Sequence, residues 1–282
     1  MLGGPGAVEQ AEWIRRDGQL ETNREKRFAG KRLMAILAHP DDESFGMGGT
    51  LARYKDLGAE TVLVCATRGE AGKCGDPPLC WPEDLGQFRE EETRRACAVL
   101  QIDQLHFLDY RDQDTNVAPP WEIVGKVIAL IRRYRPDVLV TFGPEGLSGH
   151  KDHTSIGHYA TMAYLLSGST DAYRGYEPYQ CPYLYYICLH PGMSRTMGRG
   201  FSRPTSQIHV AVPVRQYLPQ KRAAIDCHQT QIGSIRRIGY LSGPSIDDPE
   251  LDQLRSFEYY HQVFPQIPLR DDGEGMRSEL FE

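Results

Sequence analysis

An unbroken apolar run passes directly into a polar cluster in the stretch LMAILAHPDDES, residues 33–44. Residues 33–38 have the length and composition of a strand that is buried on both faces, as in a parallel sheet. The six residues that follow bring one imidazole and three carboxylates together. The stretch therefore predicts a buried strand that ends in a chemical site, an arrangement typical of the carboxyl edge of open α/β sheets.

Four further apolar runs repeat the pattern of this strand. They occupy residues 61–66, 105–108, 137–142 and 183–189. Amphipathic segments that favour helices separate or follow the runs, at residues 45–57, 88–100, 121–134, 153–166 and 216–229. Because strands alternate with helices, we predict an α/β fold, a single Rossmann-like domain with a mostly parallel twisted sheet flanked by helices.

The ends of the chain are polar and depart from this pattern. We predict an N-terminal extension at residues 1–30, the α/β domain at residues 31–264 and a peripheral C-terminal tail at residues 265–282. The turn-rich block at residues 72–86 contains Cys74 and Cys80, and it is predicted to be a loop within the domain. One α/β domain is compatible with a chain of 282 residues.

Composition excludes several classes of function. The formal net charge of −6 argues against a protein that coats nucleic acid. No apolar run approaches the roughly 20 residues of a membrane span, and the N-terminus lacks the pattern of a signal peptide. Seven dispersed cysteines fit reduced thiols in a cytoplasmic protein. We therefore expect neither a nucleic-acid partner nor a membrane span, and a homo-oligomer is one of the possible assemblies.

A second polar cluster, GLSGHKDH at residues 146–153, follows the apolar run at residues 137–142. The carboxyl ends of parallel strands meet at one edge of a sheet, so the two clusters are expected to lie together. Crowded carboxylates repel one another unless a cation or a proton is present. Two histidines and one carboxylate form a three-ligand zinc site, which leaves a further carboxylate as a base and a further histidine to stabilise an oxyanion.

Each cluster also has a simpler explanation when it is taken alone. HPDDE at residues 39–43 could begin a helix, with Asp42 or Ser44 as the cap and acidic groups in the field of the helix dipole. HKDH at residues 150–153 could be a solvated loop. Capping does not readily explain two such clusters that each follow a buried strand, so the pair favours a metal site.

The two motifs together resemble the PIG-L/LmbE-like family of zinc-dependent N-deacetylases, which act on N-acetylglucosaminyl compounds. The resemblance extends over about residues 32–231. It implies an enzyme that hydrolyses the acetamide of a small amino-sugar conjugate with one Zn²⁺ per chain. Fe²⁺ also suits a set of two histidines and one carboxylate. Lys151 and Ser148 depart from residues common in the second motif of the family, namely Pro and, in some members, Tyr.

The resemblance also implies roles for individual residues. The implied zinc ligands are His39, Asp42 and His153. Asp41 is the implied general base, and His150 is implied to stabilise the oxyanion while Asp152 orients it. Weaker matches imply four substrate-binding residues, Arg68, Arg89, Asp112 and His228.

Other interpretations stay open at this point. The four weaker matches could be surface charges, a turn residue and a packed helix histidine, and Cys74 and Cys80 could bind a metal, form a disulfide or be incidental. A metallohydrolase that acts on another amide or on a phosphoester, or a non-catalytic carbohydrate binder, would also fit. A nucleotide-binding module is disfavoured, because no G-x-G-x-x-G motif follows the first strand.

Overall fold

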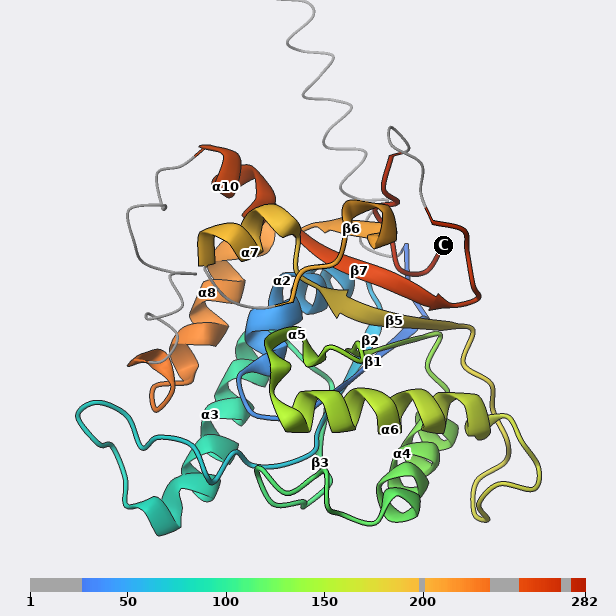
Figure 1. Ribbon diagram of the computed structural model, residues 1–282, viewed down its shortest axis with the longest axis horizontal. Coiled ribbons are helices and arrows are strands. Elements are labelled where there is room, and N and C mark those ends of the chain that lie inside the picture. The colour runs from blue at the N-terminus through green and yellow to red at the C-terminus, as the bar shows by residue number, and fades with distance from the viewer. Residues whose placement is uncertain (1–26, 198–200, 234–248, 270–274) are drawn as a thin grey trace, which may run out of the picture.

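The computed structural model describes residues 27–197, 201–233, 249–269 and 275–282 (Figure 1). Within them, seven strands form one sheet in the order β3-β2-β1-β4-β5-β7-β6. The strands are β1 (Arg32–Leu37), β2 (Glu60–Cys65), β3 (Gln104–Phe107), β4 (Val138–Phe142), β5 (Tyr183–Cys188), β6 (Val210–Pro213) and β7 (Phe257–Phe264). Strands β1 to β5 are parallel, whereas β7 is antiparallel to β5 and β6. This confirms the predicted α/β class with a mostly parallel sheet.

Helices flank the sheet (Figure 1). The α-helices are α2 (Asp42–Asp56), α3 (Leu85–Leu100), α4 (Pro120–Tyr134), α5 (Gly146–Gly149), α6 (Lys151–Ser167), α7 (Pro191–Met197), α8 (Leu218–Cys227) and α10 (Pro249–Arg255). Short 3₁₀ helices are η1 (Pro82–Asp84), η2 (Thr205–Gln207) and η3 (Arg215–Tyr217). Helices α4 and α6 pack together, as do α2, α3 and α8. None of the helices in the described part of the chain combines the length and apolar character that crossing a bilayer requires.

The central strands are buried on both faces. Residues 33–38 and 138–140 are each at most 1% exposed. Helix α4 buries apolar residues spaced three and four apart, Ile123, Val124, Val127, Ile128 and Ile131, so one stripe of this helix faces the core. Apart from threonines such as Thr61 and Thr141, the central strands bury apolar side chains, so the charged residues gather where these strands end.

The direction of the strand order changes at β1. Strands β2 and β3 lie on one side of it, and β4 and β5 lie on the other. Residue Leu33 is paired with Val138 and Ala35 with Val140, so β1 and β4 end at the same edge. A crevice forms outside the carboxyl ends of strands at such a switch point. The polar clusters after β1 and β4 both begin at this crevice.

The antiparallel edge of the sheet was not expected from the sequence. The run FEYYHQVF at residues 257–264 is rich in the aromatic residues that strands favour, and it forms β7. Strand β7 lies between β5 and β6, so a late segment of the chain extends the sheet beside the earlier parallel strands.

Both ends of the described chain reach the core. Leu280 is fully buried, and the hydroxyl of Tyr54 donates a hydrogen bond to Glu279 at 3.0 Å. This differs from the expectation of a peripheral tail. Phe28, inside the expected N-terminal extension, is 5% exposed and its ring centroid lies 5.3 Å from that of Tyr54. Residues 1–26 of the expected extension lie outside the described residues.

Replacing Gly157 in α6 by Ala is expected to lower the free energy of unfolding by about 1–3 kcal/mol, the usual effect of overpacking. A Cβ atom there would lie 2.5 Å from the carbonyl oxygen of Phe142 and 3.1 Å from its carbonyl carbon, and these backbone atoms cannot rotate away. The helical preference of Ala offsets only roughly 0.5–1 kcal/mol of this loss.

The matched control is Gly275→Ala, because a Cβ atom at Gly275 meets no described atom within 4 Å. Its unfolding free energy should stay within about 0.5 kcal/mol of the parent value in a denaturant titration. Equal stability of the two variants would show that α6 does not approach β4 as closely as described.

Candidate active site

The chain turns from β1 into α2 through the HPDDE motif. Asp41 occupies the N-cap position with a φ of 102°, in the left-handed region that non-glycine residues rarely adopt. Its side chain makes no capping hydrogen bond to the helix. The hydroxyl of Ser44 donates to Glu43 at 2.6 Å, and Asp42 already belongs to the first turn of α2. Neither Asp42 nor Ser44 is therefore the cap residue, although Asp42 and Glu43 lie in the first turn and Glu43 accepts a hydrogen bond from the backbone N–H of Asp41 at 3.1 Å.

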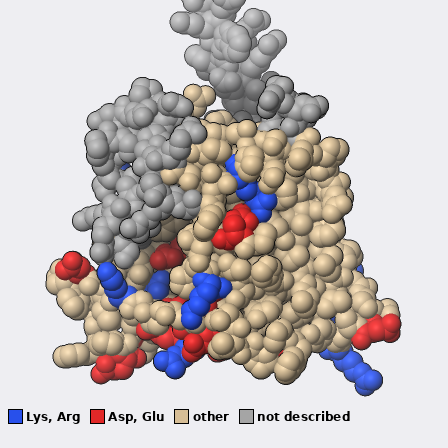
Figure 2. Space-filling model, viewed as in Figure 1, with Lys and Arg blue, Asp and Glu red and all other residues tan. Residues whose placement is uncertain are grey.

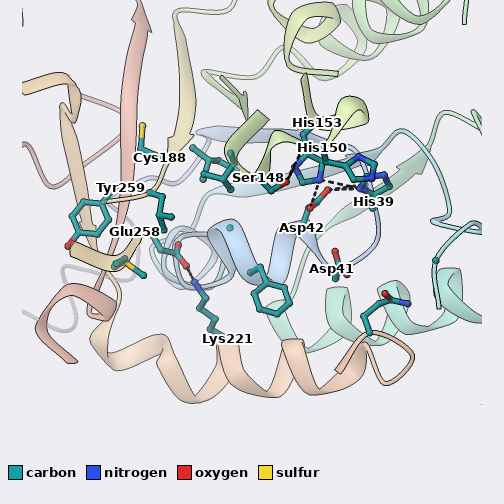
Figure 3. Close-up of a pocket in the computed structure, with 18 of the residues that line it drawn as sticks. His39, Asp41, Asp42, Ser148, His150, His153, Cys188, Lys221, Glu258 and Tyr259 are labelled. Atoms are coloured by element: carbon teal, nitrogen blue, oxygen red, sulfur yellow. Dashed lines mark hydrogen bonds and ion pairs between the residues drawn. The ribbon is translucent and has the colours of Figure 1, made fainter. Parts of the chain in front are cut away.

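The two ring nitrogens of His39 face different groups (Figure 3). Its Nδ1 atom lies 3.2 Å from Nε2 of His153 and 3.6 Å from the Asp42 carboxylate. On the other side of the ring, Nε2 lies 3.2 Å from the Asp152 carboxylate and 3.0 Å from that of Asp112. Because a carboxylate accepts hydrogen bonds, we assign the ring proton to Nε2, which leaves the lone pair of Nδ1 directed to Asp42 and His153.

His153 is fixed in the same manner from the other side of the crevice. Its Nδ1 atom lies 3.0 Å from the carbonyl oxygen of Gly146, which can only accept a hydrogen bond, and 3.2 Å from the hydroxyl of Ser148, which can accept as well as donate. We therefore assign the ring proton to Nδ1. The Nε2 atom then presents its lone pair 3.2 Å from the Asp42 carboxylate. The ring stacks on Phe142 with the two centroids 4.2 Å apart, which limits its rotation.

Three groups that can each donate an electron pair thus converge. They are Nδ1 of His39, Nε2 of His153 and the carboxylate of Asp42. Lone pairs held this close repel one another unless a cation or a proton lies among them. Imidazole nitrogen and carboxylate oxygen are ligands of Zn²⁺, and partners on the far ring nitrogens are typical of metal-binding histidines. The chemistry of this donor set fits a divalent metal ion.

The electrostatics of the cluster also favour positive charge. Burial opposes protonation of His39, but hydrogen bonds to Asp112, Asp152 and Asp42 raise its pKa well above the ordinary value. Burial would likewise raise the pKa of Asp42, yet His153 and His39 hold it well below its ordinary value. A cation in this crevice would therefore meet carboxylates that are already ionised.

Asp41 points into the cavity beside this cluster (Figure 3). Its side chain is 22% exposed, and its carboxylate lies 3.3 Å from Nη2 of Arg89. Arg89 is held in place because it donates to the carbonyl oxygens of Gly69 at 2.8 Å and of Pro40 at 2.5 Å. Burial raises the pKa of Asp41 to about 6, although Arg89 acts in the opposite direction.

His150 lines the cavity, and its ring centroid is 4.7 Å from that of His39. At the start of α6, its Nδ1 atom accepts a hydrogen bond from the backbone N–H of Asp152 at 3.2 Å. Nε2 therefore carries the proton in the neutral ring. Burial lowers the pKa of His150, and the nearby His39 and His153 lower it further.

Asp152 contacts His150 and His39 through different atoms. Besides contacting His39, it accepts hydrogen bonds from the backbone N–H of Gln113 at 2.6 Å and from the hydroxyl of Thr115 at 2.7 Å. The backbone of Asp152, rather than its carboxylate, orients His150. The carboxylate instead fixes His39, because the geometry of α6 directs it toward β1.

A cavity of 510 Å³ opens beside these groups. One part of its wall is apolar and comprises Phe45, Leu147, Ile187, Leu189, Met193, Phe257 and Tyr259. Lys221 and Glu258, 2.5 Å apart, also line it and lie away from the histidines (Figure 3). Lys221 and Glu258 were not expected at the site from the sequence, because α8 and β7, which carry them, contain no local motif. Only the strand-like composition of residues 257–264 gave a signal.

The four expected substrate-binding residues divide into two pairs. Arg89 and Asp112 line the cavity, whereas Arg68 and His228 lie outside its lining. Arg68 forms ion pairs of 2.5 Å with Glu90 and with Asp109. His228 is fully buried, and its Nε2 atom lies 2.8 Å from the carboxylate of Glu43. These placements do not fit direct contact of Arg68 or His228 with a substrate in this cavity.

Charged residues are unevenly distributed on the face shown in Figure 2. Several acidic and basic side chains lie close together on the lower part of this face, whereas wide areas carry neither charge. Where opposite charges lie this close, their fields largely cancel beyond a Debye length of about 8 Å at physiological ionic strength. The described part of this face is therefore one of mixed charge.

Comparison with known proteins identifies sequence relatives. A family described as "PIG-L: GlcNAc-PI de-N-acetylase" matches residues 34–165. A protein of Thermobispora bispora named 1D-myo-inositol 2-acetamido-2-deoxy-alpha-D-glucopyranoside deacetylase is 32% identical over 244 aligned positions, which cover 73% of this chain and 80% of that protein. A Bacillus anthracis protein named probable N-acetyl-alpha-D-glucosaminyl L-malate deacetylase 2 is 27% identical, with coverage of 72% and 83%.

Comparison with solved structures identifies the same fold. The N,N'-diacetylchitobiose deacetylase of Pyrococcus horikoshii aligns with a TM-score of 0.65 at 22% identity. The alignment covers 96% of this chain and 99% of that chain. At this level of identity the likeness concerns the α/β fold alone.

Replacing Lys221 by Met is expected to lower the free energy of unfolding by about 3–5 kcal/mol, because it leaves the carboxylate of Glu258 buried without its cation. The two side chains are only 3% and 4% exposed. The control is Lys31→Met, which removes a pair with Asp137 whose side chains are 49% and 22% exposed. That change should cost less than about 1 kcal/mol. Similar losses in both variants would show that the Lys221 pair is not buried as described.

Proposed function

The chain belongs to the PIG-L family of GlcNAc-PI de-N-acetylases, and on that premise we propose that it is a metal-dependent N-deacetylase. Its substrate would be a small N-acetylglucosaminyl-type conjugate. The named relatives are deacetylases of acetamido sugars with different second groups, inositol in one and malate in another. The observation that carries the proposal is the convergence of Nδ1 of His39, Nε2 of His153 and the Asp42 carboxylate beside a cavity of substrate size.

Three residues would hold the metal ion, namely His39, Asp42 and His153. His150 offers a nitrogen within 4.8 Å of the other two histidines, but the Asp42 carboxylate is closer to both and also supplies negative charge. Asp112 and Asp152 form a second group with His39 on the side of the ring that carries the proton. They would therefore orient His39 instead of binding the ion. The donor set suits Zn²⁺ and also accommodates Fe²⁺.

When bound, the ion would supply Lewis acidity, which polarises an amide carbonyl and makes water a stronger acid. Asp41 would take the proton of the attacking water, since its carboxylate lies in the cavity wall next to Asp42. The N–H of His150 would donate to the carbonyl oxygen as that atom gains negative charge. The amine leaves only after it is protonated, and Asp41 would return the proton that it took.

The expected metal content is about one divalent ion per chain, because one convergent set of donors is proposed. Dialysis against a chelator should remove both the ion and the release of acetate from 2-acetamido-2-deoxyglucosides, and added Zn²⁺ should restore both. Elemental analysis and an acetate assay on the same sample test this. A value near two ions per chain, or no retained ion after loading with zinc, would contradict the proposal.

The two neighbouring aspartates should give opposite phenotypes on substitution by Asn. Asp41→Asn is expected to retain the metal and to lower kcat by about 10²–10⁴, the usual effect of losing a general base. Asp42→Asn is expected to weaken metal affinity, with activity partly recovered in excess Zn²⁺. Each variant serves as the control for the other. If Asp41→Asn is the variant that loses the metal, the proposed roles are reversed.

A further inference from the structure

The cavity beside the proposed metal ligands has a polar end and an apolar end. In Figure 3, Asp41 and the labelled histidines lie together, whereas Cys188, Glu258 and Tyr259 lie apart from them. Strands β5 and β7 supply this distant wall, with Ile187 and Cys188 from β5 and Tyr259 from β7. A substrate whose acetamide reaches the histidines would extend its other end toward that wall.

The apolar wall is already formed and closely packed. Cys188 is paired with Tyr259 across the two strands. These two residues form a hydrophobic cluster with Met193 and Ile208, in which each residue is at most 6% exposed. The hydroxyl of Tyr259 donates to the carbonyl oxygen of Leu254 at 3.1 Å, so its polar group is directed into the protein. The wall therefore offers a ligand mainly apolar surface.

The charged groups that line the distant part of the cavity neutralise one another. Lys221 pairs with Glu258 at 2.5 Å, and this carboxylate also accepts hydrogen bonds from the backbone of Gly49 at 3.0 Å and of Thr50 at 2.7 Å. At the polar end, Arg89 pairs with Asp41. Lys221 and Arg89, both in the described lining, therefore each have a carboxylate partner. Binding of an anionic ligand is favoured by a cation without such a partner, so these two pairs do not favour an anionic ligand.

We propose that the distant end of the cavity binds the aglycone of the substrate, and that this aglycone is apolar, a ring or alkyl group in place of inositol or malate. This inference rests on the proposed deacetylase function, which puts the acetamide at the polar end. A cavity of 510 Å³ lies within the range of about 300–1,000 Å³ that holds drug-sized ligands. It therefore has room for the sugar and for one further group.

The test compares kcat/KM for the methyl, benzyl and myo-inositol α-glycosides of N-acetylglucosamine on the zinc-loaded enzyme, with acetate release as the readout. Burial of a phenyl ring should favour the benzyl glycoside over the methyl glycoside by on the order of 10- to 100-fold. Equal values for these two glycosides, or a higher value for the inositol conjugate than for the benzyl glycoside, would overturn the proposal. Either result would leave the deacetylase function intact.

A pair of variants locates the effect in the cavity. Met193→Gln changes the apolar wall with little change in size, and it should reduce the preference for the benzyl glycoside several-fold. The matched control is Met162→Gln in α6, where the side chain is 45% exposed and lies outside the cavity lining. It should leave the preference unchanged. If Met193→Gln keeps the melting temperature of the parent protein and also keeps its preference for the benzyl glycoside, Met193 does not belong to the proposed subsite.

A third comparison separates the aglycone from the acyl group as the source of apolar surface. Faster hydrolysis of the N-hexanoyl methyl glycoside than of the N-acetyl methyl glycoside would assign the apolar end to the acyl group and overturn the aglycone proposal. If no substrate releases acetate, the proposed function fails, and binding of the benzyl and methyl glycosides is then compared by calorimetry. Tighter binding of the benzyl glycoside would support an apolar subsite, and equal binding would overturn it.

Discussion

The proposed site depends on the close approach of two imidazole nitrogens and one carboxylate at the crevice between β1 and β4, namely those of His39, His153 and Asp42. Neither histidine can relieve the repulsion by changing its tautomer without losing a partner. The far nitrogen of His39 faces Asp112 and Asp152, and that of His153 faces the carbonyl oxygen of Gly146. The lone pairs toward Asp42 are therefore imposed by the surroundings. Such an arrangement is stable only with a positive charge among the three groups, and this requirement is the physical basis of the proposed metal site.

The fold meets this requirement at the carboxyl edge of the parallel strands. His39 and His153 are far apart in sequence, but they follow β1 and β4, which are neighbours in the sheet. The apolar strands exclude polar groups from the interior, so both clusters emerge at the carboxyl edge. Helix α6 adds a further constraint, because its first turn holds His150 through a backbone N–H and directs Asp152 toward His39. These strand ends supply the polar groups, and β5, β7 and α8 complete the wall of the cavity beside them.

Much of the fold and part of the site could be predicted from the sequence, for reasons that differ between residues. HPDDE and HKDH each follow an apolar run that predicts a buried strand. Because parallel strands end at the same edge of a sheet, the two motifs could be expected to lie close together there. Asp112 and Arg89 were expected in the cavity and line it. Arg68 and His228 line no part of it, since ion pairs with residues remote in sequence hold them elsewhere. The apolar wall depends on how β7 inserts beside β5, which no local pattern specifies.

Anomalous X-ray scattering at the zinc edge, from crystals of the zinc-loaded protein, tests the central claim most directly. We expect one strong peak per chain, bounded by Nδ1 of His39, Nε2 of His153 and the carboxylate of Asp42. His39 also forms a group with Asp112 and Asp152 on its other side, so the measurement has a clear alternative. A peak between those two carboxylates, or no peak at the crevice, would contradict the tautomers assigned to His39 and His153 and with them the proposed metal site.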